Sequence, residues 1–190
     1  MVETTAPEMT LPLAKLEHTA GGMKLSTKYR GILTIRGDQS LSGFSDWFKS
    51  HFSVDCPKVG ETVRGEGLCL YWQGPDQLLL CCEDYDTAQE WLVKLENSRP
   101  EAPWVSVIDI SDYYCTISLE GARGFDILRQ GSPYDFGSLA EGKAIFTGFQ
   151  HANILVDHAD ENRLEVMVRT SFSRYLWDHL VYASNQLTHF

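Results

Sequence analysis

Two stretches of this sequence repeat the same succession of patterns at nearly the same spacing. An apolar strand pattern ends before Gly37 and another ends before Gly121, 84 positions further on, and each precedes an apolar helical pattern. Trp91 and Trp177, which are 86 positions apart, each lie in the middle of a later helical pattern. We therefore predict an α+β fold built from two ferredoxin-like strand–helix–strand–strand–helix units. The alternative is that two unrelated α+β stretches share similar patterns.

The patterns divide the chain into an arm and one duplicated domain. Residues 1–27 show little periodicity, and we expect them to form an extended N-terminal arm. Residues 28–190 are expected to form a single domain with halves at 28–98 and 104–185, because two prolines in the joint between them interrupt helix and strand. The expected strands are 29–36, 67–72, 78–82, 104–110, 113–119, 144–149, 152–156 and 164–168, and the expected helices are 44–52, 87–97, 121–130 and one that begins at 172, with a loop over 55–66.

Composition and charge exclude several classes of partner. The sequence is 43% apolar and 12% aromatic, as in a globular protein, and its formal net charge is −10. An acidic chain lacks the basic face that neutralises phosphates, so we expect neither a nucleic acid nor an anionic membrane as partner. No apolar run approaches the roughly 20 residues that span a bilayer, and the N-terminus lacks the basic start of a signal peptide. We expect a cytoplasmic protein.

The five cysteines point to core packing. Their number is odd, and no C-x-x-C motif occurs, which argues against a disulfide framework and against a structural zinc site. Cys69, Cys81, Cys82 and Cys115 fall in apolar strand patterns, where a free thiol behaves as a small hydrophobic side chain.

Motifs of common active sites are absent from the sequence. There is no phosphate-binding loop, dinucleotide fingerprint, nucleophile elbow or zinc-protease motif. The glycine-rich segment 60–67 contains two glutamates and lacks the lysine of a phosphate-binding loop. His151 and His158 bracket a short strand near Asp157 and Asp160, where we expect a solvated turn because a third suitably spaced ligand is missing.

Four other charged residues have ordinary structural explanations. Asp109 and Asp112 flank Ser111, and we expect them to cap a turn between strands. Arg169 and Arg174 are expected to be solvated partners in ion pairs. The residues by themselves therefore predict no catalytic, cofactor-binding or metal-binding site.

The final helical pattern has more apolar surface than one sheet requires. We expect Thr170 or Ser171 to cap this helix, whose apolar residues cover roughly two thirds of its circumference. A helix that covers one sheet needs an apolar stripe only slightly wider than about 100°. Trp177 falls outside the main face, so we expect it either to anchor the chain to a partner or to close the edge of its own core. The candidate residues for a subunit interface are Trp177, Val181, Arg174 and Tyr175.

Four motifs resemble the gamma subunit of heterotetrameric sarcosine oxidase. They are 74–80 (G-P-D-Q-L-L-L), 107–112 (V-I-D-I-S-D), 117–123 (I-S-L-E-G-A-R) and 168–180 (V-R-T-S-F-S-R-Y-L-W-D-H-L). The resemblance covers roughly residues 28–185, and the last motif is the most specific. The chain departs from the family pattern at Leu78, where the family has tryptophan, and over 131–136, where G-S-P-Y-D-F replaces G-C-P-L-D-L.

The resemblance implies a small subunit that assists assembly and has no active site of its own. In the family, the complex oxidatively demethylates N-methyl amino acids. Its larger alpha-, beta- and delta-type subunits carry FAD, FMN and NAD sites and a tetrahydrofolate-binding region. The gamma subunit resembles the folate-binding domain of the glycine-cleavage T-protein, so the same fold is expected here.

The resemblance leaves other functions open. The chain could belong to a related complex that oxidises N-methylglutamate or another secondary amine. It could instead be a free-standing protein that binds folate and transfers one-carbon groups, or a flavin-free scaffold of an unrelated complex.

Overall fold

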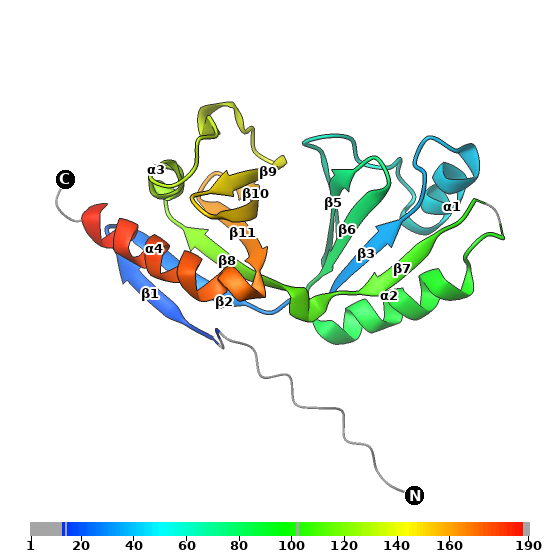
Figure 1. The fold of residues 1–190 in the computed structure, drawn as a ribbon, viewed down its shortest axis with the longest axis horizontal. Helices are drawn as coiled ribbons and strands as arrows, with labels where there is room; N and C mark the ends of the chain where they lie inside the picture. Colours follow the sequence, from blue (N-terminus) through cyan, green and yellow to red (C-terminus); the bar gives the residue numbers. More distant parts are fainter. Residues whose placement is uncertain (1–12, 14, 102, 188–190) are drawn as a thin grey trace, which may run out of the picture.

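The computed structural model describes residues 13, 15–101 and 103–187, which fold into two antiparallel sheets and four α-helices (Figure 1). The six-stranded sheet has the order β1-β2-β8-β11-β10-β9, and the five-stranded sheet has the order β4-β5-β6-β3-β7. The strands are β1 (Glu17–Ala20), β2 (Met23–Lys28), β3 (Ile32–Arg36), β4 (Thr62–Gly65), β5 (Leu68–Gly74), β6 (Gln77–Cys82), β7 (Ser106–Asp109), β8 (Tyr114–Glu120), β9 (Ala144–Phe149), β10 (Ala152–Asp160) and β11 (Arg163–Arg169). The helices are α1 (Ser42–Phe52), α2 (Tyr85–Asn97), α3 (Gly124–Arg129) and α4 (Ser173–Gln186), with 3₁₀ turns at Ser111–Tyr113, Phe136–Ser138 and Thr170–Phe172.

Local hydrogen bonds explain where two of the helices begin. Asp84 precedes α2 in an extended conformation, and its carboxylate accepts a hydrogen bond of 2.7 Å from the backbone N–H of Thr87. The prediction that Thr170 or Ser171 caps the last helix was wrong. These two residues form a 3₁₀ turn, and the Ser173 hydroxyl donates to the Thr170 carbonyl at 2.7 Å before α4 begins.

The order of elements confirms the α+β class and the duplication, but each unit has three strands between its two helices where the predicted unit has two. The succession β3–α1–β4–β5–β6–α2 in the first half corresponds to β8–α3–β9–β10–β11–α4 in the second half. Strand neighbours agree, because β4-β5-β6-β3 in one sheet matches β9-β10-β11-β8 in the other. The register of strand pairing agrees as well. Ile32 pairs with Cys81 in the first half. Their counterparts, Thr116 (84 positions after Ile32) and Met167 (86 positions after Cys81), pair with each other in the second half.

Each half also contributes one strand to the sheet of the other half. β2 precedes β3 in the chain but pairs with β8, whereas β7 precedes β8 but pairs with β3. The two pairings are equivalent. Asp109 of β7 pairs with Leu33 of β3, and Thr27 of β2 pairs with Ile117 of β8, which is the counterpart of Leu33 in the second half. Neither sheet can therefore be completed by residues of one half alone.

Two segments that were expected to be irregular are strands. The expected arm over 1–27 is wrong for its second part, because Glu17–Ala20 and Met23–Lys28 form β1 and β2; residues 1–12 and 14 lie outside the described residues. The segment 55–66 was predicted to be a loop, but it contains β4, which pairs with β5. Glycines and charges hide the strand pattern at both places.

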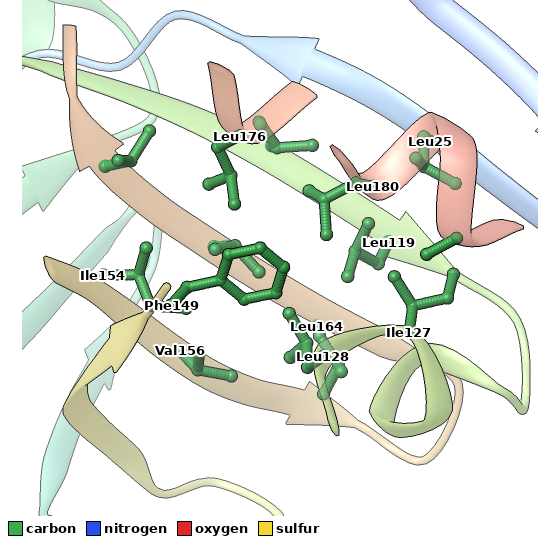
Figure 2. Packing of buried hydrophobic residues seen from close by; sticks show 14 of the residues in the cluster. Leu25, Leu119, Ile127, Leu128, Phe149, Ile154, Val156, Leu164, Leu176 and Leu180 are labelled. Carbon is green, nitrogen blue, oxygen red and sulfur yellow. The ribbon is translucent and has the colours of Figure 1, made fainter. Parts of the chain in front are cut away.

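Three apolar clusters hold the layers together. Helices α3 and α4 cover the outer face of the six-stranded sheet, where leucines from sheet and helices meet around Phe149 (Figure 2). Helices α1 and α2 cover the outer face of the five-stranded sheet in the same way. The inner faces of the two sheets meet in a third cluster, formed by Ile32, Tyr71, Leu79, Cys81, Ala144, Leu155 and Met167. The structure therefore has its helices outside and its two sheets inside (Figure 1).

Gly31, the residue before β3, lies very close to the start of α2. A Cβ atom at Gly31 would lie 2.3 Å from the Cβ of Ala88 and 2.4 Å from the carbonyl oxygen of Asp84. We expect Gly31→Ala to lower the free energy of unfolding by about 1–3 kcal/mol, as overpacking commonly does. Gly148→Ala is the control, because no heavy atom lies within 4 Å of a Cβ there. Denaturant unfolding measures both, and equal stability of the two variants would contradict the packing described.

Candidate functional site

The inner faces of the two sheets hold an ion pair with a buried carboxylate and a partly exposed guanidinium. Asp157 of β10 is only 1% exposed. Both of its carboxylate oxygens accept hydrogen bonds from the guanidinium of Arg64 on β4, with Nη1 to Oδ2 at 3.1 Å. The Tyr71 hydroxyl on β5 donates to Oδ2 at 2.8 Å. Tyr71 and Asp157 are 86 positions apart, so the repeat places equivalent positions of the two halves against each other.

Burial and neighbouring charges shift the pKa values of Tyr71 and Arg64. Burial raises the pKa of Tyr71 well above its usual value, and the adjacent carboxylate of Asp157 raises it further. Burial alone would lower the pKa of Arg64, but its hydrogen bonds to Asp157 raise the pKa overall. Tyr71 is therefore a neutral donor and Arg64 a permanent cation. Arg64 neutralises Asp157, and the two residues together donate three hydrogen bonds to it.

A second buried carboxylate lies on the neighbouring strand. Glu165 of β11 is 4% exposed, and its Oε1 accepts a hydrogen bond of 3.1 Å from the Lys28 ammonium. Arg30 and Arg163 approach the same oxygen to 3.7 and 3.9 Å. Burial alone would lower the pKa of Arg30, but the charge of Glu165 raises it overall. One carboxylate thus faces three cations.

The cations around Glu165 also line a cleft of about 600 Å³. Lys15 adds a fourth positive charge to its wall, and Glu83 supplies one carboxylate. The wall is therefore positive in a chain whose formal net charge is −10. A group of this kind attracts an anion, and chemically it is suited to binding rather than to proton transfer.

The candidate interface residues of α4 do not form one surface. Trp177 is 6% exposed and belongs to the core under the helix, and Val181 packs against the same core. Arg174 is exposed and pairs with Asp178 at 3.0 Å. Tyr175 is half-buried, and its hydroxyl donates to Gln150 at 2.7 Å. Of the two roles expected for Trp177, the structure shows closure of its own core.

The width of the apolar face on α4 has an explanation within the chain. α4 contacts β1, β11 and α3. Because residues 17–28 were expected to be an arm, the sheet predicted from the sequence was two strands too narrow. The extra apolar surface of α4 that suggested a partner belongs to this wider sheet.

The other candidates from the sequence have structural roles. The segment 60–67 leads from β4 into β5, so its backbone N–H groups do not open a helix as in a flavin or dinucleotide phosphate site. The Asp157 carboxylate is already bound by the Arg64 guanidinium. The His158 ring contacts the Leu139 carbonyl at 2.9 Å. Across residues 13, 15–101 and 103–187, no three His, Cys, Asp or Glu side chains could hold a metal ion. Within the same ranges, no helix has the length and hydropathy to cross a bilayer.

Asp109 and the cysteines behave as predicted. The Asp109 carboxylate accepts hydrogen bonds from the N–H and the hydroxyl of Ser111, at 2.9 and 2.6 Å, which fixes the turn after β7. All five cysteines are free. Burial raises the pKa of Cys82 and of Cys115 to about 11, so both thiols stay protonated at neutral pH.

Reasoning from the sequence missed the buried carboxylates. Asp157 was assigned to a polar turn, although β10 continues through it to Asp160. Glu165 lies in the strand expected over 164–168, and no role was predicted for it. The repeat could have indicated the position of Asp157, because Tyr71 and Asp157 share the 86-residue offset that also brings the sulfur atoms of Cys81 and Met167 within 3.7 Å.

Duplicated α+β halves that exchange strands and pack sheet to sheet define the class of fold. The structure is similar to a chain of heterotetrameric sarcosine oxidase from Corynebacterium sp. U-96 in complex with pyrrole 2-carboxylate, with a TM-score of 0.77 and 22% identity over 90% of this chain and 89% of that one. It is also similar to glycine cleavage system aminomethyltransferase T from Bartonella henselae, with a TM-score of 0.62 and 14% identity over 80% of this chain and 43% of that one. The expected likeness to the T-protein fold is thus confirmed.

Sequence comparison then gives the family. The model of the sarcosine oxidase gamma subunit family matches residues 36–186, and the chain belongs to this family. The sarcosine oxidase subunit gamma of Corynebacterium sp. (strain U-96) is 27% identical over 134 residues, which cover 68% of this chain. The match spans 63% of the length of that relative.

The Arg64–Asp157 ion pair predicts a measurable stability effect. Asp157→Ala leaves the buried Tyr71 hydroxyl without its acceptor, while the partly exposed Arg64 guanidinium can be solvated, and we expect a loss of about 1–3 kcal/mol in the free energy of unfolding. Asp178→Ala is the control, because it breaks an exposed ion pair on α4 and should cost no more than about 1 kcal/mol. Denaturant unfolding of both variants measures the difference. A loss at Asp157 as small as that at Asp178 would contradict the structural role assigned to the pair.

Trp177 gives a second test, because its two expected roles have different readouts. We expect Trp177→Ala to lower the free energy of unfolding of the isolated chain by about 3–5 kcal/mol, through loss of core packing. Tyr182→Ala on the same helix removes a mainly exposed ring and should change stability by about 0.5 kcal/mol or less. An unchanged stability of the Trp177 variant, together with its loss from a co-purified complex, would show that Trp177 is an anchor.

Proposed function

We propose that this chain is the gamma subunit of a heterotetrameric flavoenzyme of the sarcosine oxidase type. The observation that carries this proposal is the family match over residues 36–186, within which both duplicated halves fall almost completely. In the complex, the chain contributes to assembly and stability. We assign the oxidation of the N-methyl amino acid to the larger subunits.

The chemistry of the inner faces supports a structural role. Asp157 is neutralised by Arg64 and hydrogen-bonded by Tyr71, and Glu165 is paired with three cations. A general base requires a carboxylate that can exchange protons with a substrate. Asp157 instead links β10 of one sheet to β4 and β5 of the other.

We further propose that FAD, FMN, NAD and tetrahydrofolate are bound by the larger subunits of alpha, beta and delta type. The glycine-rich segment of this chain leads into a strand and does not fit a dinucleotide phosphate. Five free thiols and an acidic composition support a cytoplasmic location for the assembly.

Co-expression tests this function. The chain carries an affinity tag and is produced together with larger subunits of the sarcosine oxidase type from the same organism, and in parallel alone. We expect the tagged chain to retain the larger subunits together with their flavin absorbance, whereas the chain alone is colourless. Omitting the chain should reduce the yield of assembled enzyme, and adding the separately purified chain should restore it.

Two results would contradict the proposal. One is a chain that elutes without any larger subunit although all subunits are soluble. The other is stoichiometric flavin, or sarcosine oxidation, in the preparation of the chain alone.

A further inference from the structure

One edge of the five-stranded sheet is open in the part of the chain that the structure describes. β7 pairs with β3 on one side, and no described strand pairs with its other side (Figure 1). Its counterpart β2 in the six-stranded sheet is paired on both sides, with β8 and with the short antiparallel strand β1. The duplication therefore shows what covers this edge in the other half: one short antiparallel strand.

The described residues of the chain do not supply that strand for β7. β1 reaches β2 through the turn Gly21-Gly22, so a copy of β1 would have to lie directly before β7. That segment carries Pro100 and Pro103, and described residues 98–101 and 103–105 form no strand. Proline has no N–H to donate to a strand ladder.

The open edge carries exposed apolar side chains. Trp104, two residues before β7, is 67% exposed, and Ile108 within β7 is 50% exposed. An open strand edge with exposed apolar residues is a template for pairing with another chain, and proteins usually protect such edges. Here neither lysine nor proline lies within β7 to discourage pairing.

The helix beside β7 extends this surface. α2 packs along β7, and the Gln89 amide donates to the Asp109 carboxylate at 2.6 Å (Figure 1). Tyr85 and Val93, one helical turn before and after Gln89, lie on the same face and are exposed. In α4, by contrast, Val181 packs against the core of the six-stranded sheet. The missing strand thus leaves apolar residues of both β7 and α2 uncovered.

The orientation of the β7 backbone defines which groups are available. The Ile110 N–H donates to the Ile32 carbonyl at 2.9 Å, so this is a hydrogen-bonded pair. Such pairs alternate with non-hydrogen-bonded pairs in an antiparallel ladder. The Ile108 N–H therefore points to β3, whereas the N–H and C=O groups of Val107 and Asp109 point to the open edge.

The charge around this edge indicates which kind of segment can pair with β7. The stretch from α2 to the turn after β7, residues 85–112, carries more carboxylates than cations: Asp86, Glu90, Glu96, Glu101, Asp109 and Asp112 against Lys94 and Arg99. Pairing of two copies of this chain through β7 would bring these carboxylates together. A segment with basic side chains would meet opposite charge.

We propose that the open edge of β7 receives an extended segment of a larger subunit, with alternating apolar and basic side chains, as an added antiparallel strand. The segment takes the place that β1 has beside β2, hydrogen-bonds to Val107 and Asp109, and covers Trp104, Ile108 and Val93. This inference rests on the proposed function and names the surface through which the chain enters the complex.

Hydrogen exchange resolved to single amides tests the pairing in the intact complex. We expect exchange at Val107 and Asp109 to slow by at least about tenfold between the free chain and the complex, because their N–H groups gain partners. The Ile108 amide is already bonded to β3 and should change little. Unchanged exchange at Val107 and Asp109 would overturn the proposal.

A pair of matched variants tests the side chains. We expect Ile108→Asp to reduce retention of the chain in the co-purified complex by about tenfold or more, with the stability of the free chain unchanged. Val59→Asp is the control, because Val59 is 67% exposed and precedes β4 at the opposite edge of the same sheet. Equal retention of the two variants would overturn the proposal.

The remaining outcomes are distinct. If the unmodified chain fails to bind the larger subunits, both the proposed function and this inference fail. If it binds while the amides of β7 stay unprotected, only this inference fails. Protection of Val107 and Asp109 in the isolated chain at high concentration, with dimers in solution, would show that a second copy occupies the edge.

Discussion

The exchange of β2 and β7 between the two halves is the constraint on which the rest of the structure depends. Each half completes its sheet with a strand that begins the other half, so the two sheets are tied together by the crossings before β3 and β8. Gly31 lies at one crossing, where a side chain would collide with the start of α2. The two sheets pack face to face, so residues at equivalent positions of the two repeats contact each other at the interface between the sheets.

That interface explains why charged residues lie inside the protein and an apolar edge lies outside. Equivalent positions meet across the two sheets, and at one of them Tyr71 faces Asp157, which must be neutralised by Arg64 because water is excluded. Outside, the halves differ in a single strand: β1 covers β2, while prolines prevent a copy of it beside β7. The two halves are alike at the interface between the two sheets. They differ at the edge of β7, where a partner subunit is proposed to bind.

The sequence predicted the fold well where periodicity and spacing are local signals. The 84- and 86-residue offsets gave the duplicated α+β unit, and most strands and helices followed from their patterns. β1, β2 and β4 were missed, because these strands have only four to six residues and polar or charged side chains interrupt their apolar pattern. That error made α4 look too apolar, and it turned Trp177 into a candidate anchor although the ring is buried in its own core. The ion pair of Arg64 and Asp157 joins residues 93 positions apart, and a sequence pattern does not show such a contact.

Native-state hydrogen exchange on the free chain tests the central claim, that strand exchange makes one cooperative unit of two halves. The amides to compare are those of β3 and β6 in the five-stranded sheet and those of β8 and β11 in the six-stranded sheet. The account predicts that both sets open with the same free energy, equal to that of global unfolding, because neither sheet is complete without the other half. Opening of one sheet at a free energy lower by about 2 kcal/mol or more would contradict it, since the halves would then unfold independently.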